Sequence, residues 1–168
     1  MFLYYHIIPS PIGDLTALAS NETLLLLEFT DSEELPTKIK KIESYYNTKK
    51  QTIKNLILEK VETELSEYFS GNRKEFTLPL IAKGTEFQEK AWKALEKIPY
   101  GETRNYLEEA TLVGNPKAVR AIGWANHNNP IVIIIPCHRV IGKSGKLVGY
   151  GGWLDRKIWL LEHEKKHK

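Results

Sequence analysis

The sequence predicts a two-domain α/β protein, with a small antiparallel sheet and a helix in residues 1–80 and a helix-turn-helix domain in residues 85–168. Short apolar and aromatic runs separated by turn residues fill the first third, a pattern typical of antiparallel strands. The second half shows helical spacing and capping residues instead. It also holds an apolar run, Ile131–Ile135, which is typical of a buried strand and ends at Pro136 and the sole cysteine, Cys137.

The N-terminal domain is expected to begin with three strands, which one helix follows. The apolar segments Phe2–Ile8, Leu15–Ala19 and Leu24–Phe29 are separated by clusters of turn-forming residues. Residues 54–69 carry apolar side chains near helical spacing, which predicts an amphipathic helix. A further short strand, Phe76–Leu80, is expected just before the domain boundary.

The C-terminal domain begins with a helix-start signal. Thr85 and Gln88 have the spacing of a capping box, in which each side chain bonds the backbone N–H of the other residue. The helix that follows is expected to bury one face, with the residues Phe87, Ala91, Trp92, Leu95 and Ile98.

A helix-turn-helix layout follows. The first helix is expected over Tyr106–Val113, with the turn at Gly114. Asn115 is the expected N-cap of the second helix, and Pro116 its first residue, with the helix running to about Asn126. Plain helix packing produces the same pattern, so the position just before the cysteine is what favours a DNA-binding motif.

Composition narrows the class of protein. The chain is 42% hydrophobic and 27% charged, which indicates an ordinary soluble globular protein. No apolar stretch is long enough to span a membrane, and the N-terminus lacks the layout of a signal peptide. One cysteine rules out an internal disulfide framework and a cysteine-rich zinc site, which fits a reducing, intracellular environment. The net charge of +3 permits nucleic-acid binding without requiring it.

Cys137 is the candidate nucleophile. A lone cysteine is more often a small buried apolar residue than a reactive one. Here it stands in Pro136-Cys137-His138-Arg139-Val140, with an imidazole beside it at the end of an apolar run. A thiol pKa of ~8.5 falls toward neutral pH when a histidine or a cation lies near.

The pentapeptide at 136–140 resembles the active-site signature of the O6-alkylguanine-DNA alkyltransferases, which repair DNA by direct reversal. Further motifs of that family occur in the same order, in residues 87–92, 98–103, 114–123, 129–130, 149–152 and 159–164. The resemblance covers Thr85–Glu164 and is weak over residues 1–80. It implies a ribonuclease-H-like N-terminal domain and a winged-helix-like C-terminal domain that holds the active-site cysteine.

The resemblance implies a methylated-DNA–protein-cysteine S-methyltransferase. Cys137 would accept an alkyl group from O6-alkylguanine, or from O4-alkylthymine, as a stable thioether, so each molecule would act once. The implied relay runs from Cys137 through a water molecule to His138 and then to Glu164. By the same resemblance, Asn129 links the recognition helix to the active-site strand, and Tyr106 gives a proton to the departing guanine.

DNA contacts and a substrate pocket are implied in the same way. Arg120 would enter the base stack in place of the extruded nucleotide, as base flipping requires. The other implied DNA-binding residues are Asn115, Pro116, Lys117, Ala118 and Ala121. The implied pocket residues are Val140, Tyr150, Gly151, Gly152 and Lys157. The expected partner is duplex DNA carrying O6-alkylguanine, bound by a monomer without cofactor, metal or membrane, in the cytoplasm, nucleoid or nucleus.

Three positions depart from the family pattern, and three different functions compete with alkyl transfer. Glu109 occupies a position that is usually apolar, Trp124 stands where at least one member has glycine, and Gly151 stands where some members have serine. A Cys-His hydrolase would leave the helix-turn-helix unexplained and needs an oxyanion hole. The two remaining hypotheses are a winged-helix DNA-binding protein and a non-catalytic lesion sensor. Such sensors replace the cysteine, whereas Cys137 is present.

Overall fold

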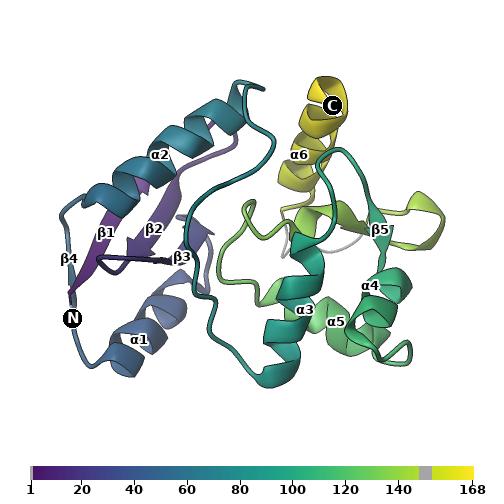
Figure 1. The fold of residues 1–168 in the computed structure, drawn as a ribbon, viewed down its shortest axis with the longest axis horizontal. Coiled ribbons are helices and arrows are strands. Elements are labelled where there is room, and N and C mark those ends of the chain that lie inside the picture. Colours follow the sequence, from purple (N-terminus) through teal and green to yellow (C-terminus); the bar gives the residue numbers. More distant parts are fainter. Residues whose placement is uncertain (1, 148–152) are drawn as a thin grey trace. The chain divides into compact units, whose positions relative to one another are not determined.

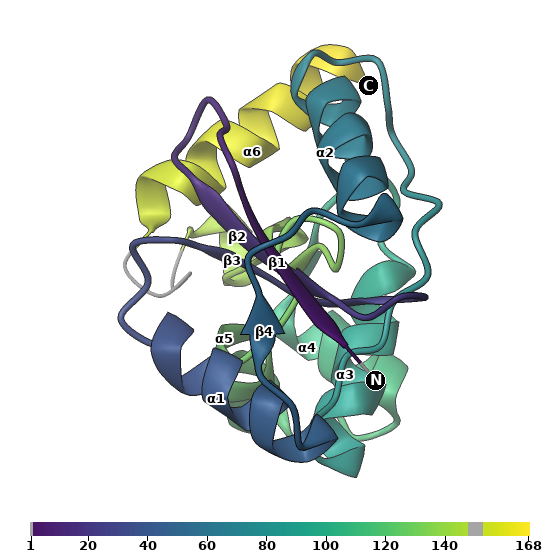
Figure 2. The same ribbon diagram turned by 90° about the vertical axis from the view of Figure 1, so that its left-hand side faces the viewer.

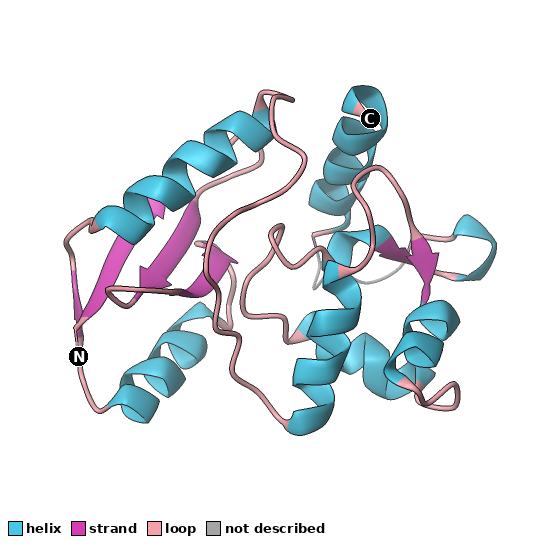
Figure 3. Ribbon diagram, in the orientation of Figure 1, coloured by secondary structure: helices cyan, strands magenta, loops and turns pink. Residues whose placement is uncertain are grey.

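The computed structural model, which describes residues 2–147 and 153–168, separates into two compact units, Met1–Ala82 and Lys83–Lys168 (Figure 1). The first unit contains the main sheet, and the second consists mostly of helices and loops (Figure 3). Within the described residues, no helix is both long enough and apolar enough to cross a lipid bilayer. This arrangement confirms the predicted mixed α/β fold, with a small N-terminal sheet and a helical C-terminal domain.

The first unit is built on a four-stranded sheet with the strand order β3-β2-β1-β4. Strands β1 (Leu3–Ile8), β2 (Leu15–Ala19) and β3 (Leu24–Phe29) pair antiparallel and confirm the three predicted strands. Strand β4 (Lys50–Gln51) pairs parallel to β1. Strands β2 and β3 are buried along their whole length, which explains why their sequences are almost continuously apolar.

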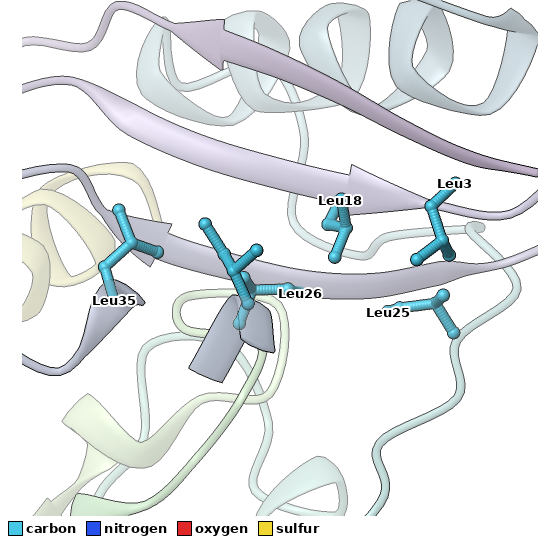
Figure 4. Packing of buried hydrophobic residues seen from close by; sticks show 6 residues of the cluster. Leu3, Leu18, Leu25, Leu26 and Leu35 are labelled. Atoms are coloured by element: carbon cyan, nitrogen blue, oxygen red, sulfur yellow. The ribbon is translucent and has the colours of Figure 1, made fainter. Parts of the chain in front are cut away.

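Two helices cover the sheet on opposite faces, α1 (Leu35–Tyr46) and α2 (Leu56–Phe69) (Figures 1 and 2). Helix α2 was predicted, and Asn55 caps it by accepting a hydrogen bond from the backbone N–H of Leu58. Helix α1 was missed. A core of aliphatic side chains fills the space between α1 and the sheet (Figure 4), and its members are Leu3, Leu18, Leu25, Leu26, Leu35 and Ile39.

The predicted strand Phe76–Leu80 is wrong. The chain touches the edge of β3 at a single point, where the N–H of Leu24 donates to the carbonyl of Pro79 and the N–H of Ile81 donates to the carbonyl of Leu24. Proline has no N–H, so Pro79 prevents a continuous ladder at this position.

In the second unit, α3 (Glu86–Glu96), α4 (Tyr106–Val113) and α5 (Val119–His127) pack around a core of alanines and one isoleucine. The capping box of Thr85 and Gln88 is present at the start of α3, as predicted. A second capping box, between Asn105 and Glu108, begins α4. The residues of the shared core are Ala91, Ala110, Ile122 and Ala125.

The second helix of the helix-turn-helix begins three residues later than predicted, because α5 starts at Val119 and not at Pro116. Asn115 does not cap it. Its N–H instead closes the end of α4 by donating to the carbonyl of Ala110, after Gly114 has turned the chain with a φ of 91°. A turn in which the N–H of Ala118 donates to the carbonyl of Asn115 therefore precedes α5.

The predicted strand Ile131–Ile135 is also wrong. The N–H of Ile135 donates to the carbonyl of Ile131, which closes a tight turn, and Ile133 has a φ of 73°. Cys137–Arg139 then forms a short 3-10 helix, η1, and β6 (Val140–Ile141) follows it.

Short elements complete the second unit. Strand β5 (Arg104–Asn105) pairs parallel with β6. A second 3-10 segment, η2 (Lys143–Gly145), follows β6, and α6 (Leu154–His167) carries the last residues of the chain. Helix α6 contacts η1, which brings its side chains to the cysteine segment.

Candidate active site

Cys137 is the first residue of η1 and carries a reduced thiol, and the residue is only 6% exposed. Its N–H donates to the carbonyl of Ile135 across Pro136, with an N···O distance of 2.8 Å. The bend at Pro136 (φ −83°, ψ 64°) therefore presents the cysteine at the start of a helical turn and not at the end of a strand.

Asn129 fixes the position of the sulfur. Its side-chain nitrogen Nδ2 lies 2.8 Å from the carbonyl oxygen of Ile135 and 3.2 Å from Sγ of Cys137. Its oxygen Oδ1 accepts the N–H of Ile131 at 3.0 Å. Asn129 is 1% exposed and lies two residues beyond α5, so one buried amide joins the end of that helix to the cysteine.

The buried carboxylate of Glu164 contacts two side chains of η1, His138 and Arg139. Nε2 of His138 is 2.7 Å from Oε2 of Glu164, which belongs to α6. Nε of Arg139 donates to Oε1 of Glu164 at 2.8 Å, and Nη2 donates to Oε2 at 3.1 Å. The backbone N–H of Gly101 adds a weaker contact to Oε1 at 3.3 Å.

The charges in this cluster follow from these contacts. Burial raises the pKa of the Glu164 carboxyl, but its contacts with His138 and Arg139 outweigh burial and hold that pKa well below its usual range. Burial lowers the pKa of His138, more than the attraction of Glu164 raises it. We therefore describe the resting state as an ionised Glu164 paired with Arg139 and a neutral imidazole.

The tautomer of His138 follows from this assignment. An ionised carboxylate only accepts hydrogen bonds, so Nε2 of His138 carries the proton and Nδ1 holds a lone pair. Nδ1 is buried and has no hydrogen-bond partner within residues 2–147 and 153–168. The imidazole is therefore in the form that can accept a proton.

Lys157 is a second buried cation near the sulfur. It is 1% exposed, and its ammonium group donates to the carbonyl oxygen of Val140 at 2.6 Å. Burial lowers its pKa, while negative charge on Cys137 raises it. A positive Lys157 and a thiolate at Cys137 therefore stabilise each other. The Val140 carbonyl keeps a second lone pair for another donor.

Tyr106 is the first residue of α4 and is half-buried. Its pKa is raised by burial first, and then by negative charge on Cys137 and Glu109. A phenol with a raised pKa keeps its proton at neutral pH, so Tyr106 is a proton donor close enough to the sulfur to sense its charge.

The predicted DNA-binding residues lie on the outside of the helix-turn-helix. Arg120, Ala121 and Trp124 are exposed on α5, and Trp124 shares a helix face with the other two because it follows Arg120 by four residues and Ala121 by three. Trp124 is 65% exposed and its ring stacks on that of His127, so the indole points outward and not into the core. The remaining members of the set, Asn115, Pro116 and Lys117, are exposed, and Ala118 is half-buried.

Family models match both units of the chain. The model described as the 6-O-methylguanine DNA methyltransferase DNA-binding domain matches residues 86–166, and the model described as its ribonuclease-like domain matches residues 3–82. The chain belongs to the 6-O-methylguanine DNA methyltransferase family. The two matches together span nearly the whole chain, which extends the family resemblance into the N-terminal residues where sequence motifs were weak.

Relatives of known name agree with this membership in the 6-O-methylguanine DNA methyltransferase family. The methylated-DNA–protein-cysteine methyltransferase of Methanosarcina acetivorans is 44% identical over 96% of this chain and 98% of its own length. The constitutive enzyme of Bacillus subtilis with the same name is 44% identical over 96% of this chain and 95% of its own length.

Solved structures of the family superpose closely. The Mycobacterium tuberculosis O6-methylguanine methyltransferase has a TM-score of 0.85 and 43% identity over 99% of this chain and 95% of its own. The structure of Mycobacterium tuberculosis OGT in complex with DNA has a TM-score of 0.84 and 43% identity, over 98% of this chain and 94% of its own.

The structure brings together Cys137, Asn129, His138, Glu164 and Lys157, which were singled out from sequence. The predicted pocket residues Tyr150, Gly151 and Gly152 lie outside the described residues. Sequence reasoning missed the role of Arg139, which donates to Glu164 and, through Nη1, to the carbonyl of Ile98 at 2.6 Å. Its place in the 136–140 motif was the only signal that pointed to it.

Proposed function

We propose that this protein repairs duplex DNA by transferring the alkyl group of O6-alkylguanine to Sγ of Cys137, once per molecule. The observation that carries the proposal is the contact of Asn129 with the sulfur of the sole cysteine, in a chain of the 6-O-methylguanine DNA methyltransferase family. We place the protein with the DNA, in the cytoplasm, nucleoid or nucleus, acting as a monomer.

The thiol must first lose its proton. In our proposal Nδ1 of His138 takes that proton through a bridging water molecule, because the imidazole starts neutral with its lone pair at Nδ1. The imidazolium that forms is then stabilised by Glu164, 2.7 Å from Nε2. The ammonium group of Lys157 and the N–H of Asn129 favour the thiolate.

The transfer is a displacement at a saturated carbon. The sulfur forms a bond to the alkyl carbon as the bond from that carbon to O6 of guanine breaks. The departing guanine takes up one proton, which we assign to Tyr106, so that an ordinary guanine base is left behind. The product at Cys137 is a thioether, which water does not cleave, so the protein is consumed in the reaction.

The target base must leave the duplex to reach the sulfur of Cys137, a residue that is only 6% exposed. We assign Arg120 the task of filling the gap in the base stack, since it is exposed on α5. The exposed residues Asn115, Pro116, Lys117 and Ala121, with Ala118, would lie along the same DNA surface. We assign the Val140 carbonyl to the alkylated base.

Mass spectrometry of intact protein and peptides tests the proposal. After incubation with excess duplex containing O6-methylguanine, we expect one added methyl group per chain, located on the peptide that holds Cys137. Unmethylated duplex is the control and should leave the mass unchanged. More than one lesion repaired per active molecule would contradict the single turnover, and repair by Cys137→Ser would contradict the site.

A further inference from the structure

A buried glutamate and a half-buried asparagine meet between the two helices of the helix-turn-helix. Glu109 of α4 is fully buried, and its Oε1 accepts a hydrogen bond from Nδ2 of Asn126 of α5 at 2.7 Å. One oxygen on each side chain is left over. Oε2 of Glu109 and Oδ1 of Asn126 are both buried, and neither has a hydrogen-bond partner among the described residues.

The two leftover oxygens belong to side chains that already share one hydrogen bond, and a second bond between them requires a proton. A carboxylate oxygen and an amide carbonyl oxygen are both acceptors, so they cannot bond as they stand. A protonated Oε2 becomes a donor, and Oδ1 of Asn126 is an unpaired acceptor on the side chain that already bonds Oε1. The carboxylic acid and the amide would form a ring closed by two hydrogen bonds, which is how these planar groups pair.

We propose that Glu109 is protonated in the folded protein at neutral pH, and that its closed acid–amide pair with Asn126 fastens α4 to α5. One proton satisfies both otherwise unpaired buried oxygens, each of which costs free energy if left alone. Glu109 is then a positioning residue, since it acts on the DNA surface through Asn126 and α5.

The surroundings of Glu109 support the neutral form. Helix α4 packs against α3, α5, β5 and β6, and within the described part of those elements no Lys, Arg or His forms an ion pair with Glu109. The titratable group that senses its charge is Tyr106 of α4. Burial raises the pKa of Glu109 to about 8, and the hydrogen bond from Asn126 only partly opposes that increase.

A consequence for DNA binding follows, and it rests on the proposed function. Helix α5 carries Arg120 on its exposed face, and Asn129 follows it to hold the sulfur. Loss of the proton places an uncompensated negative charge between α4 and α5, where burial makes it costly. The arrangement that binds DNA is then populated less, so duplex affinity should fall on the alkaline side.

The experiment measures duplex affinity against pH for the parent protein, for Glu109→Gln and for Glu86→Gln. Glutamine cannot ionise, and it can form the same two bonds to Asn126. If only the protonated form binds, the parent should lose about tenfold in affinity one pH unit above the midpoint of about 8. The duplex affinity of Glu109→Gln should not change over that pH range. Glu86→Gln removes an exposed carboxylate on α3 and should follow the parent.

Carbon-13 NMR of the glutamate side chains tests the proton directly in the parent protein, so it does not depend on the folding of a variant. The carboxyl signal that is missing from Glu109→Gln should titrate near pH 8. Titration at the ordinary glutamate pKa of ~4.3 would overturn the proposal. If the duplex affinity of the parent does not change with pH, the proposed effect of Glu109 on DNA binding would be overturned. Failure of alkyl transfer to Cys137 would instead contradict the proposed function and leave the NMR result standing.

Discussion

The guanidinium of Arg139 contacts both carboxylate oxygens of Glu164, at 2.8 and 3.1 Å. Glu164 therefore has a permanent cationic partner and does not need a charged His138 to stay ionised. The imidazole is left to rest in its neutral form and to become charged only when the thiol gives up its proton. The charge of Arg139 also lowers the pKa of His138, which favours the neutral imidazole in the resting state.

Glu164→Gln should slow alkyl transfer and raise the pKa of the Cys137 thiol. Without the carboxylate, the imidazolium of His138 loses its stabilising charge, so less thiolate forms at neutral pH. The measurement is the pH dependence of the reaction of the single thiol with a thiol reagent. The midpoint should move to higher pH. Glu162→Gln, an exposed change on the same helix, is the control and should keep the parent profile.

The same substitution should destabilise the second unit. It leaves Arg139, which is 7% exposed, as a buried cation without its anion, and such a loss typically costs ~3–5 kcal/mol. Denaturant unfolding of Glu164→Gln and Glu162→Gln measures the difference. Equal stabilities would show that Arg139 finds another partner.

Arg120→Ala should separate DNA handling from chemistry. Extrusion of a base costs a few kcal/mol, so loss of the residue that fills the gap should slow duplex repair by about 10- to 100-fold. Free benzylguanine needs no extrusion and should react at nearly the parent rate. Lys90→Ala removes an exposed cation on α3 and serves as the control. Equal slowing of both substrates would show that Arg120 supports the fold or the pocket.

Asn129→Ala should slow both substrates, in contrast to Arg120→Ala. The change removes the N–H donor to Sγ and leaves the buried N–H of Ile131 without the side chain that accepts it, while the carbonyl of Ile135 keeps only the N–H of Cys137. Each unsatisfied buried group costs about 1–3 kcal/mol, so stability should fall as well. Rates with free benzylguanine, measured well below the melting temperature, test the effect on the sulfur. If Asn129→Ala reacts as fast as the parent, Asn129 has no role in alkyl transfer.

Glu109 should make stability fall as the pH rises. Its pKa is about 8 in the folded protein against an ordinary value of 4.5, so between these values the folded protein holds a proton that the unfolded chain has released. The contribution of Glu109 is therefore full below about pH 4.5 and is lost as the pH rises to about 8. Between these pH values, the melting temperature of the parent should fall relative to that of Glu109→Gln. A difference in melting temperature that does not change with pH would indicate that Glu109 is an ordinary, ionised carboxylate.

Features of the fold that depend on local signals were predicted well from sequence. The capping box at Thr85 and the helix Tyr106–Val113 are specified by residues within one or two turns of the backbone. The start of α5 was misplaced because Asn115 donates its N–H to α4, a choice that depends on the preceding helix. The segment Ile131–Ile135 was misassigned because Asn129 binds its backbone and bends it, which no apolar pattern reveals.

The site was predicted in part for the same reason. Cys137 and His138 are neighbours in sequence, and the family resemblance placed Glu164 beside them. Arg139 escaped notice because sequence alone does not distinguish a buried arginine from an exposed one. The pairing of Glu109 with Asn126 needs two helices in register, so the sequence could show only that a glutamate occupied an apolar position.

The left-handed backbone at Ile133 limits how the active-site segment can evolve. Glycine and asparagine suit a φ of 73°, yet the position is only 1% exposed. Glycine would leave a void, asparagine would bury an amide, and valine or leucine would keep the strained backbone. No natural side chain satisfies both demands, so a saturation library at this position should yield only compromises. The segment that leads to Cys137 thus carries a residue whose backbone conformation and burial favour different side chains.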